Sequence, residues 1–272
     1  MIEILRQQFL DNDSAEDKLN KIREFLQVIS LKIIYDKNFF KNMAFVGGTA
    51  LRVLFGLRRF SEDLDFSLTR KTGYNFPKIN SEIVNALRLY GLNVESQVRA
   101  AGNVHSSVIK FSGLLKEAGL SALNEQKLRI KIEVDANPPK GWHIQDSVVN
   151  KTYIFGIRHF DLPSLYATKL HACFYRKFTK GRDIYDLIWY LSKQIKPNLV
   201  LLNNAIKQTE GRSPKINQLN FKEFLLREIE KIDFKEAKRD VERFLEDKAE
   251  LKFFEPKAIK GLINDKYEHK RA

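Results

Sequence analysis

The pattern of apolar residues changes near residue 160 of the chain. Before it, short apolar runs typical of strands alternate with stretches of helical spacing. After Leu162-Pro163 the pattern is almost entirely helical, with Asp161 as the expected N-cap residue and Pro163 in the first helical turn. We therefore expect an α+β chain of two domains. Residues 1–160 would form a small mixed β-sheet flanked by helices, and residues 161–272 a helical domain.

Within the first domain, the expected elements are short and follow one another closely. The apolar residues of 15–40 recur at helical spacing and predict a long amphipathic helix. The alternating run LRIKIEVD, residues 128–135, is the clearest strand, and Pro138-Pro139 ends it. The other expected elements are strands at 43–46, 61–68, 93–99, 106–111 and 151–156, and helices at 50–57 and 80–90.

The chain carries a large excess of positive charge. Lys and Arg number 47 against 34 Asp and Glu, a formal net charge of +13 in 272 residues. Such an excess usually reflects an anionic partner, nucleic acid first, although some proteins are basic without one. Cys173 is the single cysteine, which excludes an intrachain disulfide and fits a reducing, cytoplasmic compartment. We expect no membrane contact, because no apolar run is long enough to span a bilayer.

Two acidic residues stand one residue apart in FVGGTALRVLFGLRRFSEDLDFSL, residues 45–68. In a strand, Asp63 and Asp65 would point to one face, about 6.5–7 Å apart along the backbone. Such a pair can share one or two divalent cations, and Mg²⁺ prefers carboxylate, phosphate and water oxygens. A third carboxylate could come from the strand at 128–135, in which Glu133 and Asp135 share one face.

The turn Gly47-Gly48-Thr49 has the features of a phosphate-binding turn. Glycines let the backbone approach a phosphate closely, and a helix N-terminus presents free amides and the positive end of its dipole. Thr49 adds a hydroxyl and could cap the helix that follows. Each motif alone is weak, because Gly-Gly is usually an ordinary turn and Asp-x-Asp more often a solvated strand edge. The ordered series of strand, Gly-Gly, helix, Asp-x-Asp strand and late acidic strand is far more specific.

This ordered series resembles the nucleotidyltransferase superfamily typified by DNA polymerase beta. The stretch GGTALRVLFGLRRFSEDLDFSL is closely similar to the AbiEii/AbiGii toxin family of type IV toxin–antitoxin and phage-abortive (abortive infection) systems. The resemblance implies that Asp63, Asp65 and a third carboxylate hold Mg²⁺ or Mn²⁺, with NTP phosphates at Gly47, Gly48 and Thr49. For the third carboxylate we expect Glu133 rather than Asp135, because Glu133 lies within the strand between apolar neighbours.

A second group of charged residues follows in LPSLYATKLHACFYRKFTKGRDIYDLIWYL, residues 162–191. Taken alone, it favours a solvated basic helix with a local Arg-Asp ion pair. The family that the chain resembles also carries a later Lys, which matches Lys169 here. It carries an Arg-Asp-x-x-Asp-like segment as well, which matches Arg182, Asp183 and Asp186. The resemblance implies that Lys169 and Arg182 bind the nucleotide triphosphate, and that Asp183 orients Lys169 or contacts the nucleophile.

The resemblance and the charge together predict a toxin that transfers NMP from an NTP to RNA, releasing pyrophosphate. The expected acceptor is the 3′ end of a tRNA, whose modification would block translation and arrest growth. A cognate antitoxin is the implied partner. The open alternatives are transfer to a protein hydroxyl, transfer to a small molecule, and a non-catalytic RNA-binding module on the same fold. The C-terminal residues Lys266, Lys270 and Arg271 form a candidate RNA-contacting end.

Overall fold

The chain divides into two compact units in the computed structural model, which describes residues 2–123, 125–193 and 195–267. The first unit comprises Met1–Gly56, Phe60–Pro138 and Ile144–His159, and the second comprises Leu57–Arg59, Pro139–His143 and Phe160–Ala272. Two short segments of the second unit, Leu57–Arg59 and Pro139–His143, therefore precede residue 160 in the chain.

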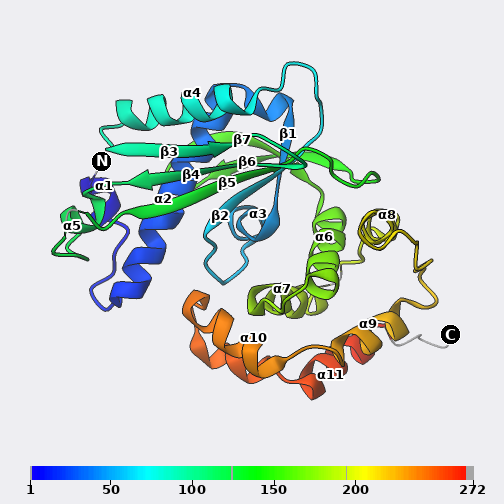
Figure 1. Cartoon of the computed structure of the whole chain (residues 1–272). Helices are drawn as coiled ribbons and strands as arrows, with labels where there is room; N and C mark the ends of the chain where they lie inside the picture. The colour runs from blue at the N-terminus through cyan, green and yellow to red at the C-terminus, as the bar shows by residue number, and fades with distance from the viewer. Residues whose placement is uncertain (1, 124, 194, 268–272) are drawn as a thin grey trace. The chain divides into compact units, whose positions relative to one another are not determined.

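The first unit is built on a seven-stranded mixed sheet in the order β3-β4-β5-β2-β1-β7-β6 (Figure 1). β2 pairs antiparallel with β1 and parallel with β5, and β4 pairs antiparallel with both β3 and β5. The expected α+β fold is thereby confirmed. The strands are β1 Met43–Val46, β2 Asp63–Leu68, β3 Val94–Arg99, β4 Val104–Phe111, β5 Leu128–Asp135, β6 Ile144–Asn150 and β7 Ile154–Phe160.

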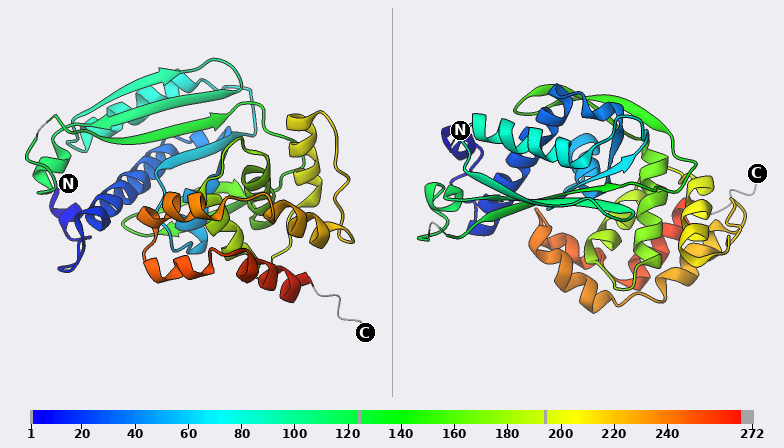
Figure 2. Two further views of the ribbon diagram at one scale, coloured as in Figure 1. Left: turned by 60° about the horizontal axis from the view of Figure 1, so that its bottom comes forward. Right: turned by 45° about the horizontal axis from the view of Figure 1, so that its top comes forward.

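Helices of the first unit cover the apolar face of this sheet. α2 begins after a capping box at Ser14, contacts β5 and packs on α4, which lies along β3 and β4 (Figure 2). Leu64 and Phe66 of β2 and Ile132 of β5 are buried, and each such side chain contributes about 1.5–3 kcal/mol to folding. The helices are α1 Ile2–Arg6, α2 Ala15–Asp36, α3 Gly47–Phe55, α4 Phe76–Leu89 and α5 Leu114–Glu117, with a 3-10 turn η1 at Phe39–Lys41.

The expected single strand at 151–156 is wrong. Two strands, β6 and β7, occupy residues 144–160, and the chain turns between them at 151–153. β6 is an edge strand whose residues are mostly exposed. Its sequence IQDSVVN therefore lacks the alternation of apolar and polar residues by which a half-buried strand is predicted.

The second unit is helical over residues 162–267, as the sequence predicts. Asp161 caps α6 by accepting a hydrogen bond from the Ser164 amide at 2.9 Å, with Pro163 in the first turn. α6 packs on α7 and α8, and α11 packs on α7 and α9 (Figure 1). The helices are α6 Leu162–Tyr175, α7 Gly181–Leu191, α8 Leu199–Glu210, α9 Phe221–Ile229, α10 Phe234–Val241 and α11 Pro256–Tyr267, with 3-10 turns η2 Glu242–Phe244 and η3 Lys248–Phe253.

The described helices are too short or too polar to cross a bilayer, and none is a candidate membrane span.

Candidate functional site

The predicted carboxylates lie on adjacent parallel strands of the first unit. In the β2–β5 register, Asp65 is opposite Glu133 and Asp63 is opposite Lys131. Lateral neighbours in register project to the same face, so these four side chains share one face of the sheet. Asp135 lies opposite Ser67, two residues farther from Asp63, and its Oδ1 accepts a hydrogen bond from the Asn137 amide at 2.9 Å. The register thus brings Glu133, more closely than Asp135, to the Asp63–Asp65 pair.

A lysine ammonium lies among these carboxylates. Lys131 Nζ is 2.8 Å from Glu133 Oε1. This hydrogen bond raises the pKa of Lys131 against the opposing effect of burial, and the charges of Glu133, Asp63 and Asp65 raise it further. The three carboxylates therefore create a negative field that already stabilises one cation.

The carboxylate oxygens of these three residues suit a divalent cation, although Glu133 is hydrogen-bonded to Lys131. Within the described residues, no three His, Cys, Asp or Glu side chains converge to hold a metal ion. Asp63 and Asp65 supply the oxygen ligands that Mg²⁺ and Mn²⁺ prefer. Glu133 could join them by exchanging the Lys131 ammonium for the metal.

Gly47 lies directly against the Asp65 carboxylate. Its φ of +81° is in the left-handed region, and an added Cβ would come within 2.4 Å of Asp65 Oδ2. Any other residue would thus be strained and would also clash with the carboxylate. Because α3 begins at Gly47, the N-terminal end of this helix lies beside Asp65. The positive end of the helix dipole and a carboxylate that could bind metal are therefore neighbours.

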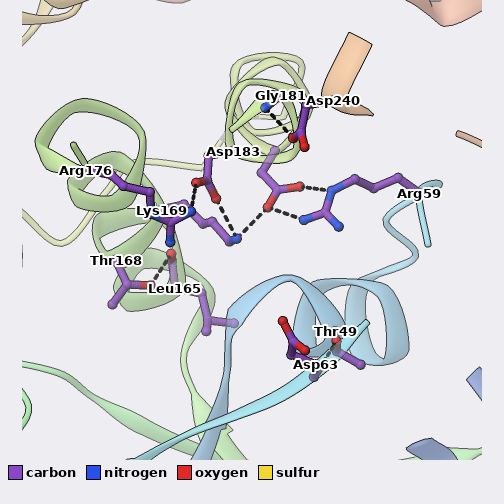
Figure 3. Close-up of polar contacts among 11 residues, drawn as sticks. Thr49, Arg59, Asp63, Leu165, Thr168, Lys169, Arg176, Gly181, Asp183 and Asp240 are labelled. Atoms are coloured by element: carbon purple, nitrogen blue, oxygen red, sulfur yellow. Dashed lines mark hydrogen bonds and ion pairs between the residues drawn. The ribbon is translucent and has the colours of Figure 1, made fainter. Parts of the chain in front are cut away.

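The expected capping role of Thr49 is wrong. α3 begins at Gly47 with Val46 as the N-cap residue, so Thr49 is the third residue of the helix. The Thr49 side chain is buried, and its hydroxyl donates a hydrogen bond to the main-chain oxygen of Asp63 (Figure 3). Thr49 therefore ties α3 to the start of β2. The sequence placed the helix start too late because a glycine pair ordinarily indicates a turn.

A cluster of five charged side chains lies inside the second unit. The Asp186 carboxylate accepts two hydrogen bonds from the Arg59 guanidinium, both at 2.7 Å, and lies 2.8 Å from Lys169 Nζ (Figure 3). Asp183 is paired with Lys169 at 3.2 Å and with Arg176 at 2.8 Å. These three cations and two carboxylates leave the cluster with a net charge of +1.

Because this cluster is buried, its charges interact strongly with one another. The Arg59 and Asp186 side chains are 2% and 0% exposed. Burial alone would lower the pKa of Lys169, but the charges of Asp186 and Asp183 outweigh it and raise the pKa. Burial would likewise raise the pKa of Asp183, yet the charges of Lys169 and Arg176 lower it. Lys169 and Asp183 are therefore both ionised at neutral pH.

The Asp183 carboxylate pairs with Lys169 and Arg176, and the Arg182 guanidinium lies 4.3 Å from the ring centroid of Phe244. The ion pair of Arg59 with Asp186 was not expected from the sequence. The two residues are 127 positions apart, and no local pattern indicates such a pair.

Comparison with protein families gives a match over most of the chain. The family model described as "Nucleotidyl transferase AbiEii toxin, Type IV TA system" matches residues 30–258. Among solved structures, the chain is similar to a candidate nucleotidyltransferase from H. pylori, with 21% identity, a TM-score of 0.54, and coverage of 90% of this chain and 95% of that one. It also matches JHP933 from Helicobacter pylori, with 20% identity, a TM-score of 0.48, and coverage of 89% and 92%. Comparison with curated proteins gives no match.

Proposed function

The chain belongs to the AbiEii family of nucleotidyl transferase toxins of type IV toxin–antitoxin systems, and we propose that it transfers an NMP from an NTP to a hydroxyl of RNA. The observation that carries this proposal is the contact of Gly47 with Asp65, which joins a helix N-terminus to a pair of carboxylates. The first feature suits phosphate and the second suits its metal counterion. Transfer of a nucleotidyl group needs both at one place.

The proposed reaction is an in-line displacement at the α-phosphorus. The acceptor oxygen forms a bond to that phosphorus, the bond to the bridging oxygen breaks, and pyrophosphate leaves while the acceptor proton is released. Mg²⁺ or Mn²⁺, when bound, would neutralise the triphosphate and favour ionisation of the acceptor hydroxyl. We assign Asp63, Asp65 and Glu133 to metal ligation. We assign the phosphates to the α3 N-terminus at Gly47, Gly48 and Thr49.

We further propose that Lys169 and Arg182 bind the triphosphate of the NTP, with Asp183 orienting Lys169. The ion pairs of Lys169 with Asp183 and Asp186 support this role, because they hold a compact charge in one position. The net charge of +1 on the surrounding cluster suits an anionic ligand. A transfer reaction requires charges that are fixed in position, because they must hold the reacting groups in one orientation.

The distribution of charge supports RNA as the acceptor. The second unit contains 27 Lys and Arg against 17 Asp and Glu, whereas the first contains 20 against 17. A net charge of +10 on one unit exceeds what a small anionic substrate requires and suits a polyanion. We propose a tRNA, modified at its 3′ end, as that polyanion. The antitoxin implied by a type IV system is the protein partner.

A transfer assay tests this function. Purified protein is incubated with Mg²⁺, total tRNA and each of the four α-³²P-labelled NTPs. We expect label on RNA that nuclease removes and protease does not. Label removed only by protease would establish transfer to protein instead, and no label with any NTP would contradict the proposal.

Two variants test the assigned residues in the same assay. Asp65→Ala should lower transfer by at least about a hundredfold, because a ligand that stabilises transition-state charge is lost. Asp146→Ala is the matched control, since Asp146 is an exposed strand carboxylate paired with Arg158. Equal rates for the two variants would refute the metal role of Asp65.

A further inference from the structure

A pocket of about 570 Å³ lies within the second unit, apart from the charged cluster. Residues from three segments of this unit line it: 196–200 at the start of α8, 218–223 at the start of α9, and 266–267 at the end of α11. Its volume falls within the range of small-ligand sites, about 300–1,000 Å³. The described C-terminal helix thus forms one wall of a space that can hold a nucleotide-sized ligand.

One side of the pocket is apolar and open to solvent. Val200 and Leu219 are 65% and 78% exposed although both line the pocket. Leu199 and the ring of Tyr267 add to this wall, and Tyr267 packs edge-on against Phe221 with ring centroids 5.3 Å apart. An exposed apolar wall that is hollowed rather than flat is typical of a ligand site.

The charged groups of the lining are mostly basic. Lys196, Lys222 and Lys266 line the pocket together with a single acid, Glu223. Lys266 Nζ donates a hydrogen bond to the main-chain oxygen of Tyr190 and lies 5.6 Å from the ring centroid of Tyr267. Burial lowers the pKa of Lys266 to about 8. A bound anion would offset this cost of burial and favour the charged ammonium.

We propose that this pocket binds one unpaired nucleotide of the RNA acceptor, with the base on the apolar wall and the adjacent phosphate at the lysines. Aromatic or apolar walls flanked by cations are how single-stranded nucleic acid is bound without sequence readout. The net charge of +10 on this unit favours a polyanion over a neutral ligand or a peptide. The inference rests on the proposed function only in taking RNA as the acceptor.

Binding of a fluorescent single-stranded RNA pentamer to the full chain tests the proposal. The measurement is made by anisotropy in EDTA without NTP, so that it does not depend on catalysis. Val200→Glu and Leu219→Glu should each weaken binding at least about tenfold, because each places a carboxylate in the pocket beside the phosphate. Leu89→Glu is the matched control: Leu89 is 91% exposed on α4 of the first unit and should leave affinity within about twofold.

A second measurement does not depend on variants. A pentamer with one 4-thiouridine is cross-linked to the wild-type chain by light, and the adducts are mapped by mass spectrometry. We expect adducts in residues 196–200, 218–223 or 266–267. Adducts confined to other segments would overturn the proposal, as would equal effects of Val200→Glu and Leu89→Glu.

Competition separates RNA from the other ligands that this chemistry could accept. Unlabelled pentamer should displace the probe, whereas free ATP or an acidic peptide of Glu and Phe at the same concentration should not. Displacement by either of these to the same extent as by RNA would assign the pocket to that ligand and overturn the proposal. If the wild-type chain shows no transfer activity but Val200→Glu loses pentamer binding, the pocket is retained and the proposed reaction is rejected. If transfer is active but Val200→Glu binds the pentamer as tightly as the wild type, the reaction is retained and the pocket is rejected.

Discussion

Gly47 combines two constraints at a single residue. Its φ of +81° would strain any side chain, and the space for a Cβ is already taken by the Asp65 carboxylate. We expect Gly47→Ala to lower transfer by at least about a hundredfold, because relief of the clash must move the carboxylate or the helix N-terminus. The strain alone should cost about 1–2 kcal/mol of unfolding free energy. Transfer rates and urea unfolding measure the two effects separately.

Gly73 provides a control for backbone strain without the clash. Its φ is +76°, yet an added Cβ would meet nothing within 4 Å. Gly73→Ala should therefore show a similar loss of stability with transfer close to wild type. If Gly47→Ala and Gly73→Ala retained equal activity, the contact with Asp65 would have no part in the reaction.

Lys131 is a second residue whose neighbours predict a measurable effect. Its ammonium is bound to Glu133 and stabilised by Asp63 and Asp65. Lys131→Met removes this competing cation, so we expect Mn²⁺ to bind about two- to fivefold more tightly, the effect of losing one partly exposed ion pair. Calorimetric Mn²⁺ titration gives the affinity. Lys110→Met, on β4, is the control, because the Lys110 ammonium lies 4.0 Å from Glu95, a residue outside the candidate site. Unchanged or weaker Mn²⁺ binding in Lys131→Met alone would contradict the predicted competition.

Which neighbouring side chains could be predicted depends on how far apart the residues lie in the sequence. The period of a strand is two, so Asp63 and Asp65 were expected to share a face, and β2 has this geometry. The neighbour Glu133 was expected from the alternation in LRIKIEVD. The pairing of Arg59 with Asp186 could not be predicted, because 127 residues separate them and only the packing of the second unit brings them together.

At the scale of elements, the segment Leu57–Arg59 is held by the second unit although it connects α3 to β2. Arg59 forms an isolated β-bridge with Leu245 and the buried ion pair with Asp186. Arg59→Ala should lower the free energy of unfolding by about 3–5 kcal/mol, because Asp186 loses its bidentate partner while buried. Urea unfolding at pH 7 measures the loss.

The adjacent residue Arg58 is the matched control for this prediction. The Arg58 side chain is 61% exposed, and its guanidinium lies 3.3 Å from Glu250. This surface ion pair joins an arginine to a carboxylate, as the buried pair of Arg59 with Asp186 does. Arg58→Ala should cost no more than about 1 kcal/mol. A loss of similar size in both variants would mean that the Arg59–Asp186 pair is no stronger than a surface pair.

Elements with a strong period were predicted, and the weakly patterned ones were not. The strand at 43–46 has the bounds of β1, because it is a short apolar run that is mostly buried. The strand at 128–135 has the bounds of β5, because buried apolar residues alternate along it. β6 was missed since an edge strand with exposed side chains has no apolar face to reveal it. The start of α3 was misplaced because Gly47 reads as a turn and is in fact the first helical residue.

At the scale of the whole molecule, the net charge of +13 is unevenly distributed between the two units. The second unit carries +10 and the first +3, a difference that composition alone does not reveal. The segment from Lys169 to Arg182 includes no acidic residue, and Lys177 and Lys180 in it are exposed. Polyanion binding should therefore depend mainly on the second unit.

This uneven charge predicts how tRNA binding responds to salt and to charge reversal. We expect the affinity for total tRNA to fall steeply between 50 and 200 mM KCl, because lysine–phosphate contacts release counterions. The double variant Lys177→Glu, Lys180→Glu should weaken binding at 100 mM KCl at least about tenfold and make the salt dependence shallower. The same change at the exposed Lys71 and Lys78 of the first unit alters net charge equally and should cost about twofold or less. Filter binding across the salt series distinguishes them: equal losses in the two double variants would show that tRNA responds to total charge, and that the second unit is not its binding surface.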